Sequence, residues 1–343
     1  MDELRTGVFY LGDNLEILSC FIPDSSIDLI YLDPPFGSNR DYRILYKKSG
    51  GKQPGTRKQA FSDTWSWDRA AEDTLEEIVQ TAPPELGKLI QGMVAGLGSS
   101  PVAGYLVMIT PRLLELHRVL KDTGSLYLHC DPTASHYLKL VLDCIFGVRN
   151  FRNEIAWSYK GGGRSTKYFA RKHDIIFFYS KSDNWTFNYK DILVERTNRT
   201  YFTDDDGRRY WLKYGKRYYL KNEGKIPEDW WADIEPLDGP YKERLGYPTQ
   251  KPLTLLERIV KASSNLGDTV LDPFCGSGTT LFAAQKLGRR WIGIDCNRNA
   301  SDISVGRFND SFPGILFETV DLTGDSRTDL NEQNPLQINP VKE

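Results

Sequence analysis

The sequence predicts an open α/β fold in which a mostly parallel sheet presents polar residues at the carboxyl ends of its strands. Two segments carry this prediction. An apolar run over residues 29–32 stops at Asp33 and two prolines, and a second run over residues 269–271 stops at Asp272 and a glycine-containing turn. Apolar strands that end at an acidic residue and a turn are typical of such sheets, in which ligands bind beyond the strand ends.

The first half of the chain alternates apolar runs of strand length with segments of helical period. Consecutive prolines cannot join a sheet interior, so Pro34 and Pro35 must end the strand before them. Asp131 and Pro132 suit the N-cap and the first position of a helix. The predicted elements are a strand over 8–11, a helix over 14–20, a strand over 27–32, a polar and mobile loop over 37–61, a helical region after it, a helix over 103–120, a strand over 125–129 and a helix over 133–146.

The second half changes character before the α/β alternation returns. Aromatic and polar residues alternate over 184–219 around turn signals such as Asp205-Asp206-Gly207, which predicts hairpins. Residues 324–343 are polar without periodicity and predict a disordered or loosely attached tail. The remaining predicted elements are a strand over 174–180, a helix over 253–264, a strand over 269–271, a helix over 279–287 and a strand over 290–294.

Composition narrows the class of protein. A chain of 343 residues can form one catalytic domain with an elaboration, and its apolar runs fall short of the roughly 20 residues that span a bilayer. The start Met1-Asp2-Glu3 is acidic where a secretory signal would be basic, and the five cysteines form no CxxC pair. We therefore expect a cytoplasmic protein with reduced thiols. The four histidines do not combine with the cysteines into metal-ligand spacing, so we expect no bound metal.

Charge is unevenly distributed along the chain, although the net charge is only −2. Residues 151–225, which we call the basic window, carry 17 Lys and Arg against 9 Asp and Glu, whereas the rest of the chain carries 27 against 37. The basic window also holds 18 of the 42 aromatic residues. This composition indicates a surface for a polyanion, although a solvated β-rich region with its cations on the wet face would have it too.

The turn that begins at Asp272 has the composition of a small-cofactor site. Gly276 and Gly278 let the backbone approach a ligand at the N-terminus of a predicted helix. No lysine follows Gly278, which argues against a P-loop, and Leu281 stands where a dinucleotide fingerprint has its third glycine. Asp272 is placed to accept hydrogen bonds from a cationic ammonium, and Asp295 from two ribose hydroxyls. An ammonium and a ribose together describe S-adenosylmethionine.

The segment Asp33-Pro34-Pro35-Phe36 suits an amino group on a flat ring. An aryl amine is a poor nucleophile because its lone pair is delocalised into the ring. The Asp33 carboxylate and the Pro34 carbonyl are placed to accept one N–H each, which turns the lone pair toward an incoming methyl group. The prolines stiffen the loop, and Phe36 offers a face on which the base can stack. Alone, these residues would also fit a helix or turn entry; the pairing with the second segment favours a catalytic site.

The order of the motifs resembles that of the beta-class DNA amino-methyltransferases, which modify adenine N6 or cytosine N4. In that class the catalytic motif comes first, the target-recognition region second and the cofactor motif last, as residues 33–36, the basic window, and residues 247–252 and 272–280 do here. The resemblance covers roughly residues 8–297. It implies a mostly parallel seven-stranded Rossmann-like methyltransferase sheet with helices on both faces, permuted strand order and an inserted target-recognition region.

The resemblance also implies roles for single residues, with Asp13 and Asn14 at the cofactor adenine and Thr249 and Lys251 near its methionine end. At Asp13 a helix cap or turn is the commoner reading of Gly-Asp after a strand. The implied catalytic residues are Asp33, Pro34, Pro35 and Phe36. The implied cofactor-binding residues are Asp13, Asn14, Thr249, Lys251, Asp272, Phe274, Gly276, Ser277, Gly278, Thr279 and Asp295.

Cations that alternate with glycines and aromatic residues in the basic window are expected to contact DNA phosphates. They are Lys160, Arg164, Lys167, Arg171, Lys172, Arg208, Arg209 and Lys213, with Lys216 and Arg217 beside the last three. The expected parts of the chain are the catalytic half of a methyltransferase domain at 1–150, a target-recognition region at 151–240, the cofactor-binding half at 241–323 and a tail at 324–343.

The expected activity is methyl transfer from S-adenosylmethionine to adenine N6 in duplex DNA, with the target base flipped out of the helix. Aspartate at position 33, in place of serine, favours adenine N6 over cytosine N4. Cytosine-N4 methylation, a non-catalytic DNA-binding homologue, and an RNA or protein methyltransferase stay open as alternatives. Expected partners are duplex DNA, a second copy of the chain and a cognate restriction endonuclease, and no membrane.

Overall fold

The computed structural model describes residues 4–35, 41–45, 57–62, 66–161, 166–195, 200–220, 224–237, 241 and 243–323, with the backbone alone at 41–45 and 57–62. The helices are α1 (Asn14–Phe21), α2 (Arg69–Thr81), α3 (Pro84–Leu97), α4 (Pro101–Val119), α5 (Ser135–Phe146), α6 (Leu253–Ser263), α7 (Thr279–Lys286) and α8 (Arg298–Ser311). The strands are β1 (Val8–Leu11), β2 (Ile27–Leu32), β3 (Asp41–Leu45), β4 (Arg57–Ser62), β5 (Leu120–Cys130), β6 (Phe151–Ser158), β7 (His173–Ser180), β8 (Phe202–Thr203), β9 (Arg209–Lys213), β10 (Lys216–Tyr219), β11 (Trp230–Trp231), β12 (Thr269–Asp272), β13 (Arg290–Asp295) and β14 (Glu318–Asp321).

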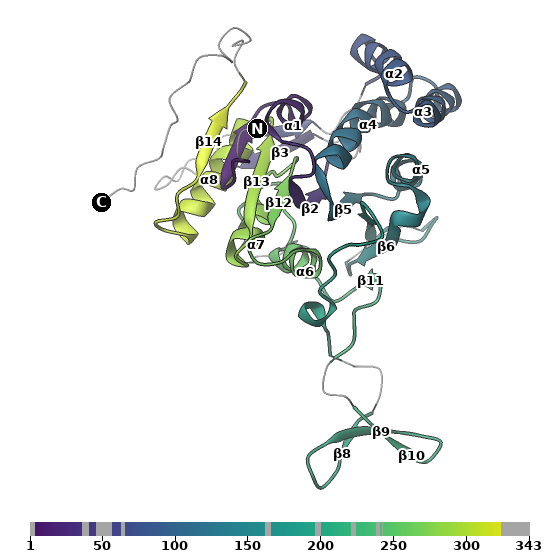
Figure 1. Ribbon diagram of the computed structural model, residues 1–343, viewed down its shortest axis with the longest axis vertical. Helices are drawn as coiled ribbons and strands as arrows, with labels where there is room; N and C mark the ends of the chain where they lie inside the picture. Colours follow the sequence, from purple (N-terminus) through teal and green to yellow (C-terminus); the bar gives the residue numbers. More distant parts are fainter. Residues whose placement is uncertain are drawn as a thin grey trace.

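A nine-stranded sheet in the order β11-β6-β7-β5-β2-β12-β13-β1-β14 forms the centre of the molecule (Figure 1). Its strands run parallel except for β7, which is antiparallel to β5 and β6. β2 and β12 come from opposite ends of the chain and pair directly, Leu29 with Val270 and Ile30 with Leu271. The predicted open, mostly parallel α/β sheet is thereby confirmed. It is wider than the expected seven strands because the short strands β11 and β14 extend its edges.

Helices cover both faces of this sheet and create two hydrophobic cores (Figure 1). On one face α1, α4 and α5 contribute buried side chains such as Ile17, Leu113 and Leu138. On the other face α6 and α7 contribute Leu255 and Leu281. Strands covered on both sides read as unbroken apolar runs, which explains why β1 and β12 are buried at every residue. Among the described residues, no helix combines the length and apolarity needed to cross a membrane.

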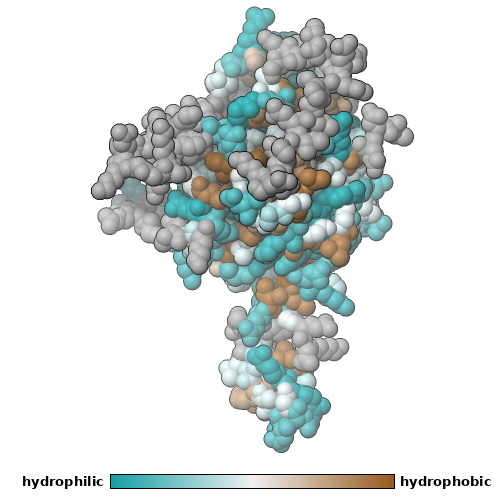
Figure 2. Space-filling view, turned by 90° about the vertical axis from the view of Figure 1, so that its left-hand side faces the viewer, coloured by the Kyte–Doolittle hydropathy of each residue, from teal (hydrophilic) through white to brown (hydrophobic). Residues whose placement is uncertain are grey.

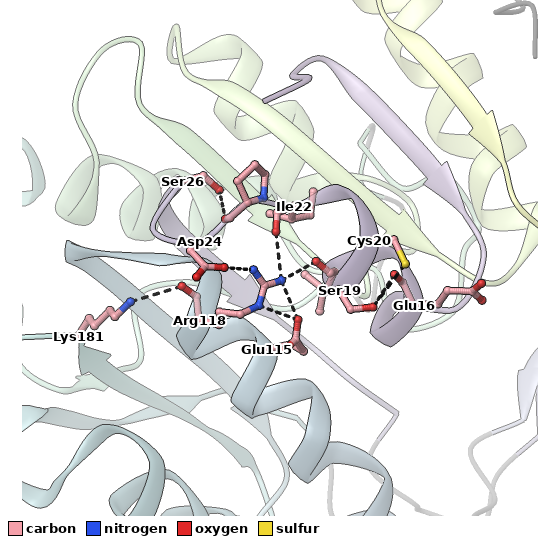
Figure 3. Close-up of polar contacts among 11 residues, drawn as sticks. Glu16, Ser19, Cys20, Ile22, Asp24, Ser26, Glu115, Arg118 and Lys181 are labelled. Carbon is pink, nitrogen blue, oxygen red and sulfur yellow. Dashed lines mark hydrogen bonds and ion pairs between the residues drawn. The ribbon is translucent and has the colours of Figure 1, made fainter. Parts of the chain in front are cut away.

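Arg118, near the end of α4, fastens that helix to the turn between α1 and β2 (Figure 3). Its guanidinium forms ion pairs with Asp24 and Glu115. It also donates hydrogen bonds to the carbonyls of Leu18 (2.8 Å) and Ile22 (3.1 Å). Carbonyls at the C-terminal end of a helix carry partial negative charge and need donors from outside it, so a cation stabilises them. The contact holds the point at which β2 enters the sheet.

The structure departs from the predicted elements in the first half of the chain. β3 and β4 pair antiparallel inside the segment 37–61, so the prediction of a loop without regular structure is wrong for these two strands. Main-chain pairing satisfies the N–H and C=O groups of both strands. This stabilisation does not depend on side chains, so a polar sequence does not indicate it. Helix α5 begins two residues later than predicted because the Asp131 carboxylate accepts from the N–H groups of Thr133 (3.0 Å) and Ala134 (3.1 Å), which forms a turn before the helix.

Other departures concern where β5 begins and elements that the sequence analysis did not predict. β5 begins at Leu120, directly after α4, because Leu120 already pairs with Ile27 of β2. The sequence analysis predicts no strand over residues 151–158, where β6 pairs with β7 inside the basic window. It also predicts no regular structure where α8 and β14 form. The predicted tail over 324–343 lies outside the described residues.

A three-stranded antiparallel sheet in the order β10-β9-β8 forms a narrow lobe below the main sheet in Figures 1 and 2. Its two hairpins confirm the prediction made for residues 184–219. Gly207 adopts a φ of 78° in the first turn, as the Asp-Asp-Gly signal requires. Aromatic rings stack across the strands, Trp211 on Tyr218 at 5.5 Å and Phe202 on Tyr210 at 5.6 Å between ring centroids. Such cross-strand pairs stabilise a sheet too small to have a core of its own.

The packing of α7 on β13 depends on Gly293 and yields a test. A Cβ added at this glycine would lie 2.4 Å from Leu281 Cδ1 and 3.1 Å from Cys275 Sγ, both buried. Gly293→Ala should therefore lower the free energy of unfolding by about 1–3 kcal/mol through overpacking. Urea titration followed by circular dichroism measures this. Gly306→Ala in the exposed part of α8, where no atom lies within 4 Å of the new Cβ, should leave stability unchanged or raise it. Equal stability of the two variants would contradict the packing argument.

Candidate active site

A cavity of about 650 Å³ opens at the edge of the sheet where β1, β2, β12 and β13 end. Parallel strands end at the same edge, so the acidic residues that end or follow them meet there although they are far apart in the chain. Asp33 and Asp272, which the two predicted segments place at strand ends, both line it. The predicted site residues on its wall are Asp13, Asn14, Asp33, Pro34, Pro35, Thr249, Lys251, Asp272, Phe274, Gly276, Ser277, Thr279 and Asp295.

The glycine turn between β12 and α7 brings the backbone to the cavity wall. Gly276 and Gly278 adopt φ values of 50° and 71°, which residues with a Cβ rarely accept. Space is short as well, since a Cβ at Gly276 would lie 3.2 Å from the Tyr247 ring and one at Gly278 would lie 2.7 Å from Ser304 Oγ. Ser304 in turn donates to the Gly276 carbonyl at 2.9 Å. Gly278 is the N-cap of α7 and is not among the residues that line the cavity.

Asp272 is buried and Asp295 is half-buried, and the charged forms of both carboxylates are disfavoured. Burial raises the pKa of Asp272 to about 7 and that of Asp295 to about 6, and the nearby charges of Asp33 and Asp295 also raise the pKa of Asp272. Main-chain donors compensate in part: the Phe274 N–H reaches Asp272 at 3.0 Å, and the Gly276 N–H reaches Asp295 at 2.8 Å. A cationic ligand that also carries N–H or O–H donors would stabilise both carboxylates.

Asp13 and Asn14 are bound within the chain as well as lining the cavity. Asp13 is the N-cap of α1 and accepts from the Leu15 N–H at 2.8 Å, which confirms the cap reading of this position. Asn14 donates to the carbonyl of Pro273 at 2.8 Å and thereby ties β1 to the loop after β12. If both residues also contact an adenine, as the resemblance implies, their side-chain atoms must bind the adenine in addition to these partners within the chain.

Lys251 reaches the loop that begins at Asp33 from the segment 247–252. Its ammonium forms an ion pair with Asp33, and the two side chains are only 11% and 16% exposed. It also donates to the Thr249 carbonyl at 3.3 Å. Thr249 holds a φ of 64°, a strained value for a β-branched residue. Strain of this kind persists only where surrounding contacts hold the backbone, and it is common at functional sites.

The predicted DNA contacts fall into two groups. Lys160, Lys167, Arg171 and Lys172 lie in the connection between β6 and β7. Since β7 starts beside the end of β5, this connection emerges at the edge of the sheet that carries the cavity. The second group consists of Arg208, Arg209 and Lys213 on the three-stranded lobe.

Ring contacts orient the cations of the lobe. The guanidinium of Arg208 lies 4.9 Å from the Tyr219 ring, and that of Arg209 lies 5.0 Å from the Tyr201 ring. The predicted site residues Phe36 and Arg164 lie outside the described residues.

Arg112 is a site residue that the sequence analysis missed. It lies on α4, lines the cavity, and donates to Asp13 (2.7 Å), Asn14 (2.6 Å) and the Met108 carbonyl (2.8 Å). An arginine directly after Pro111 in the middle of an apolar helix is the signal that would have marked it. Its effect is to hold the residues that follow β1 in place.

The chain matches the family model described as DNA methylase over residues 27–306. It is similar to the Type II methyltransferase M.EcaI of Enterobacter cloacae, with 31% identity over 60% of this chain and 58% of that protein, so the chain spans little more than half of this relative. It is similar to the DNA adenine methyltransferase YhdJ of Escherichia coli (strain K12), with 33% identity over 69% of this chain and 77% of that protein. The solved PvuII DNA methyltransferase (cytosine-N4-specific) has the same fold, with a TM-score of 0.51 and 15% identity over 93% of this chain and 98% of that one.

The burial of Asp272 predicts a pH-dependent stability of the protein without its ligand. The carboxyl has a pKa of about 7 when folded and near 4 when unfolded, so its contribution to stability is present at low pH and is lost as the pH rises from 4 to 7. Asp272→Asn removes that loss and keeps one acceptor oxygen. Its free energy of unfolding should exceed that of the wild type by about 1–3 kcal/mol at pH 8, and by less at pH 5.

Urea unfolding at both pH values measures the difference. Asp302→Asn, which changes an exposed carboxylate on α8, serves as the control and should match the wild type at both. An Asp272→Asn variant less stable than the wild type at pH 8 would contradict the view that the charged form of Asp272 destabilises the folded protein.

Proposed function

Because the chain belongs to the DNA methylase family of N6 and N4 amino-methyltransferases, we propose that it methylates the exocyclic N6 of adenine in duplex DNA. The observation that carries the proposal is the meeting of the Asp33-Pro34-Pro35 loop with Asp272 and Asp295 in one cavity. S-adenosylmethionine is the methyl donor of this family. We also infer that residues 1–150 and 241–323 form the two halves of the catalytic domain and that residues 151–240 recognise the target.

The cavity suits this cofactor in charge and in shape. Two carboxylates with raised pKa values call for a ligand that is positively charged and rich in donors, as an ammonium, a sulfonium and a ribose diol are. Asp272 would hold the ammonium and Asp295 the ribose. Glycine at position 276 lets the Tyr247 ring pack against the turn, and both residues line the cavity. Bound S-adenosylmethionine supplies a methyl group on a positively charged sulfur.

The catalytic loop would act by holding the target amine. The Asp33 carboxylate and the Pro34 carbonyl each accept one N–H, and the nitrogen lone pair is then directed out of the ring plane toward the methyl donor. Lys251 binds one oxygen of Asp33 and thereby orients the carboxylate, so that the other oxygen can accept. The amine of a paired base is not accessible inside the duplex, so the base must be extruded into the cavity.

Adenine is favoured over cytosine by two observations. Aspartate stands at position 33, where serine would favour cytosine N4. The relative YhdJ is named a DNA adenine methyltransferase. Cytosine N4 is the second candidate, because the family contains both activities and the PvuII enzyme with the same fold is cytosine-N4-specific. Several relatives are Type II methyltransferases, which supports a cognate restriction endonuclease as partner, and we propose a homodimer as the working unit.

The identity of the product tests the proposed function directly. Purified protein, duplex DNA and S-adenosylmethionine should yield N6-methyladenine when the DNA is hydrolysed and its nucleosides are separated. Asp33→Ala should lower the rate by about 10²-fold or more, because an acceptor that positions the amine is lost. Asp310→Ala, an exposed change on α8, is the control. Recovery of N4-methylcytosine alone would reverse the choice of base, and methylation of structured RNA in preference to DNA would refute the substrate.

The lobe and its cations predict how DNA binding depends on salt. The double variant Arg208→Ala, Arg209→Ala should weaken binding at low salt and reduce the slope of log K against log salt concentration by about 2, as expected for two lost phosphate contacts. Fluorescence anisotropy across a salt series measures the slope. Arg69→Ala, Lys88→Ala removes the same charge from exposed sites on α2 and α3 and should leave the slope unchanged. Identical slopes for both double variants would exclude a DNA contact at the lobe.

A further inference from the structure

A chain of buried polar side chains crosses three neighbouring strands beside the catalytic loop. Tyr31 on β2 hydrogen-bonds through its hydroxyl to Nδ1 of His129 on β5, at 2.9 Å. His129 Nε2 lies 3.3 Å from Asp174 Oδ2 at the start of β7. The hydroxyl of Tyr159 donates to the other oxygen of Asp174 at 3.4 Å. None of these residues belongs to the predicted catalytic or cofactor-binding set.

This series of hydrogen-bonded side chains leads from the cavity toward solvent. Tyr31 lines the cavity and precedes Asp33 by two residues, a spacing that puts both side chains on one face of an extended strand. The His129 side chain is 0% exposed, whereas that of Asp174 is 19% exposed. The rings of Tyr31 and Trp157 stand edge-on to the imidazole and hold it in place.

The charge of Asp174 sets the direction of every hydrogen bond in the chain. Burial raises the pKa of Asp174, but the hydrogen bonds from His129 and Tyr159 and the charge of Lys251 outweigh it and bring the pKa below the usual range. An ionised carboxylate can only accept, so in a neutral His129 the proton is on Nε2 and Nδ1 accepts. The Tyr31 hydroxyl must then donate to Nδ1. Its oxygen lone pairs are left to accept from the cavity side.

We propose that Tyr31, oriented by His129 and Asp174, takes over from the Pro34 carbonyl as acceptor of one N–H once methyl transfer has made the nitrogen tetrahedral, and takes up the proton which that amine loses. This inference rests on the proposed function. After the nitrogen–methyl bond forms and the sulfur–methyl bond breaks, the nitrogen carries a positive charge and must release one proton. That proton moves to the Tyr31 oxygen while the Tyr31 hydroxyl proton moves to His129 Nδ1. The imidazolium is stabilised by Asp174, which can pass a proton on to water.

Asp33 is the obvious competitor for this proton, but its surroundings disfavour the transfer. The Lys251 ammonium forms an ion pair with one oxygen of its carboxylate. With the other oxygen on the amine, both oxygens of Asp33 are already engaged. The assignment therefore gives the two groups different tasks: Asp33 positions the nitrogen, and Tyr31 removes its proton.

Two tyrosines on the same face of the sheet allow a matched test. Tyr31→Phe and Tyr127→Phe each remove one buried hydroxyl that makes one hydrogen bond, the latter to Ser263 at 2.8 Å and away from the cavity. Both variants should lose similar stability. Only Tyr31→Phe should lower the single-turnover rate, by about tenfold or more at saturating DNA and cofactor, with the dissociation constants unchanged. Equal rates for the two variants would overturn the proposal.

Asp174→Asn tests the direction of the relay without a change of shape. An asparagine amide can donate to His129 Nε2, which would move the imidazole proton to Nδ1 and turn the Tyr31 hydroxyl toward the amine as a donor. Nitrogen NMR of the imidazole should show protonated Nε2 in the wild type and protonated Nδ1 in the variant, and the variant should lose rate as Tyr31→Phe does. A wild type protonated at Nδ1 would refute the relay. A wild type that methylates no DNA would instead refute the proposed function, while its NMR result would still stand.

Discussion

The parallel pairing of β2 with β12 is the contact on which the rest of the site depends. Main-chain hydrogen bonds join residues 29–30 to residues 270–271, and both strands are buried between two hydrophobic cores. A slip of one residue in this register would shift Asp33 by about 3.3 Å relative to Asp272 and turn the side chains of one strand to the opposite face. The cores prevent such a slip, because it would expose apolar side chains that now face helices. Packing therefore sets the spacing between the two halves of the cavity.

The same packing imposes an electrostatic cost on the site. Asp33, Asp272 and Asp295 line one cavity, and burial raises the pKa of the latter two. The fold offsets part of this with main-chain N–H groups at the glycine turn and with Lys251 at Asp33. A bound cationic ligand would offset the rest of the cost of charging these carboxylates. The protein without ligand is therefore less stable than it would be with uncharged residues at these positions. The positive φ of Thr249 also lies at this cavity, and backbone strain of this kind is common at functional sites.

The carboxylates of the cavity and the cations of the basic window are carried by different strands of the sheet. The cavity collects carboxylates at the ends of parallel strands, whereas the basic window forms β6, β7, their connection and the lobe. β6 and β7 lie toward one end of the sheet, so the long insertion between β2 and β12 leaves their pairing intact. A cofactor site that attracts cations and a surface that attracts a polyanion would weaken each other if they overlapped.

The sequence by itself determined the fold class, most of the strands and helices, and the two segments that end at Asp33 and Asp272, because apolar period, prolines and glycines act locally. It also indicated the basic window, since composition needs no coordinates. The pairing of β3 with β4 and the addition of β11 and β14 to the sheet were decided by main-chain hydrogen bonds between distant residues, which local patterns do not encode. Arg112 at Asp13, Lys251 at Asp33 and the relay through His129 likewise exist only after folding. A side chain's partner and the pKa that burial imposes on it are properties of the packed structure, so only the tertiary fold could supply them.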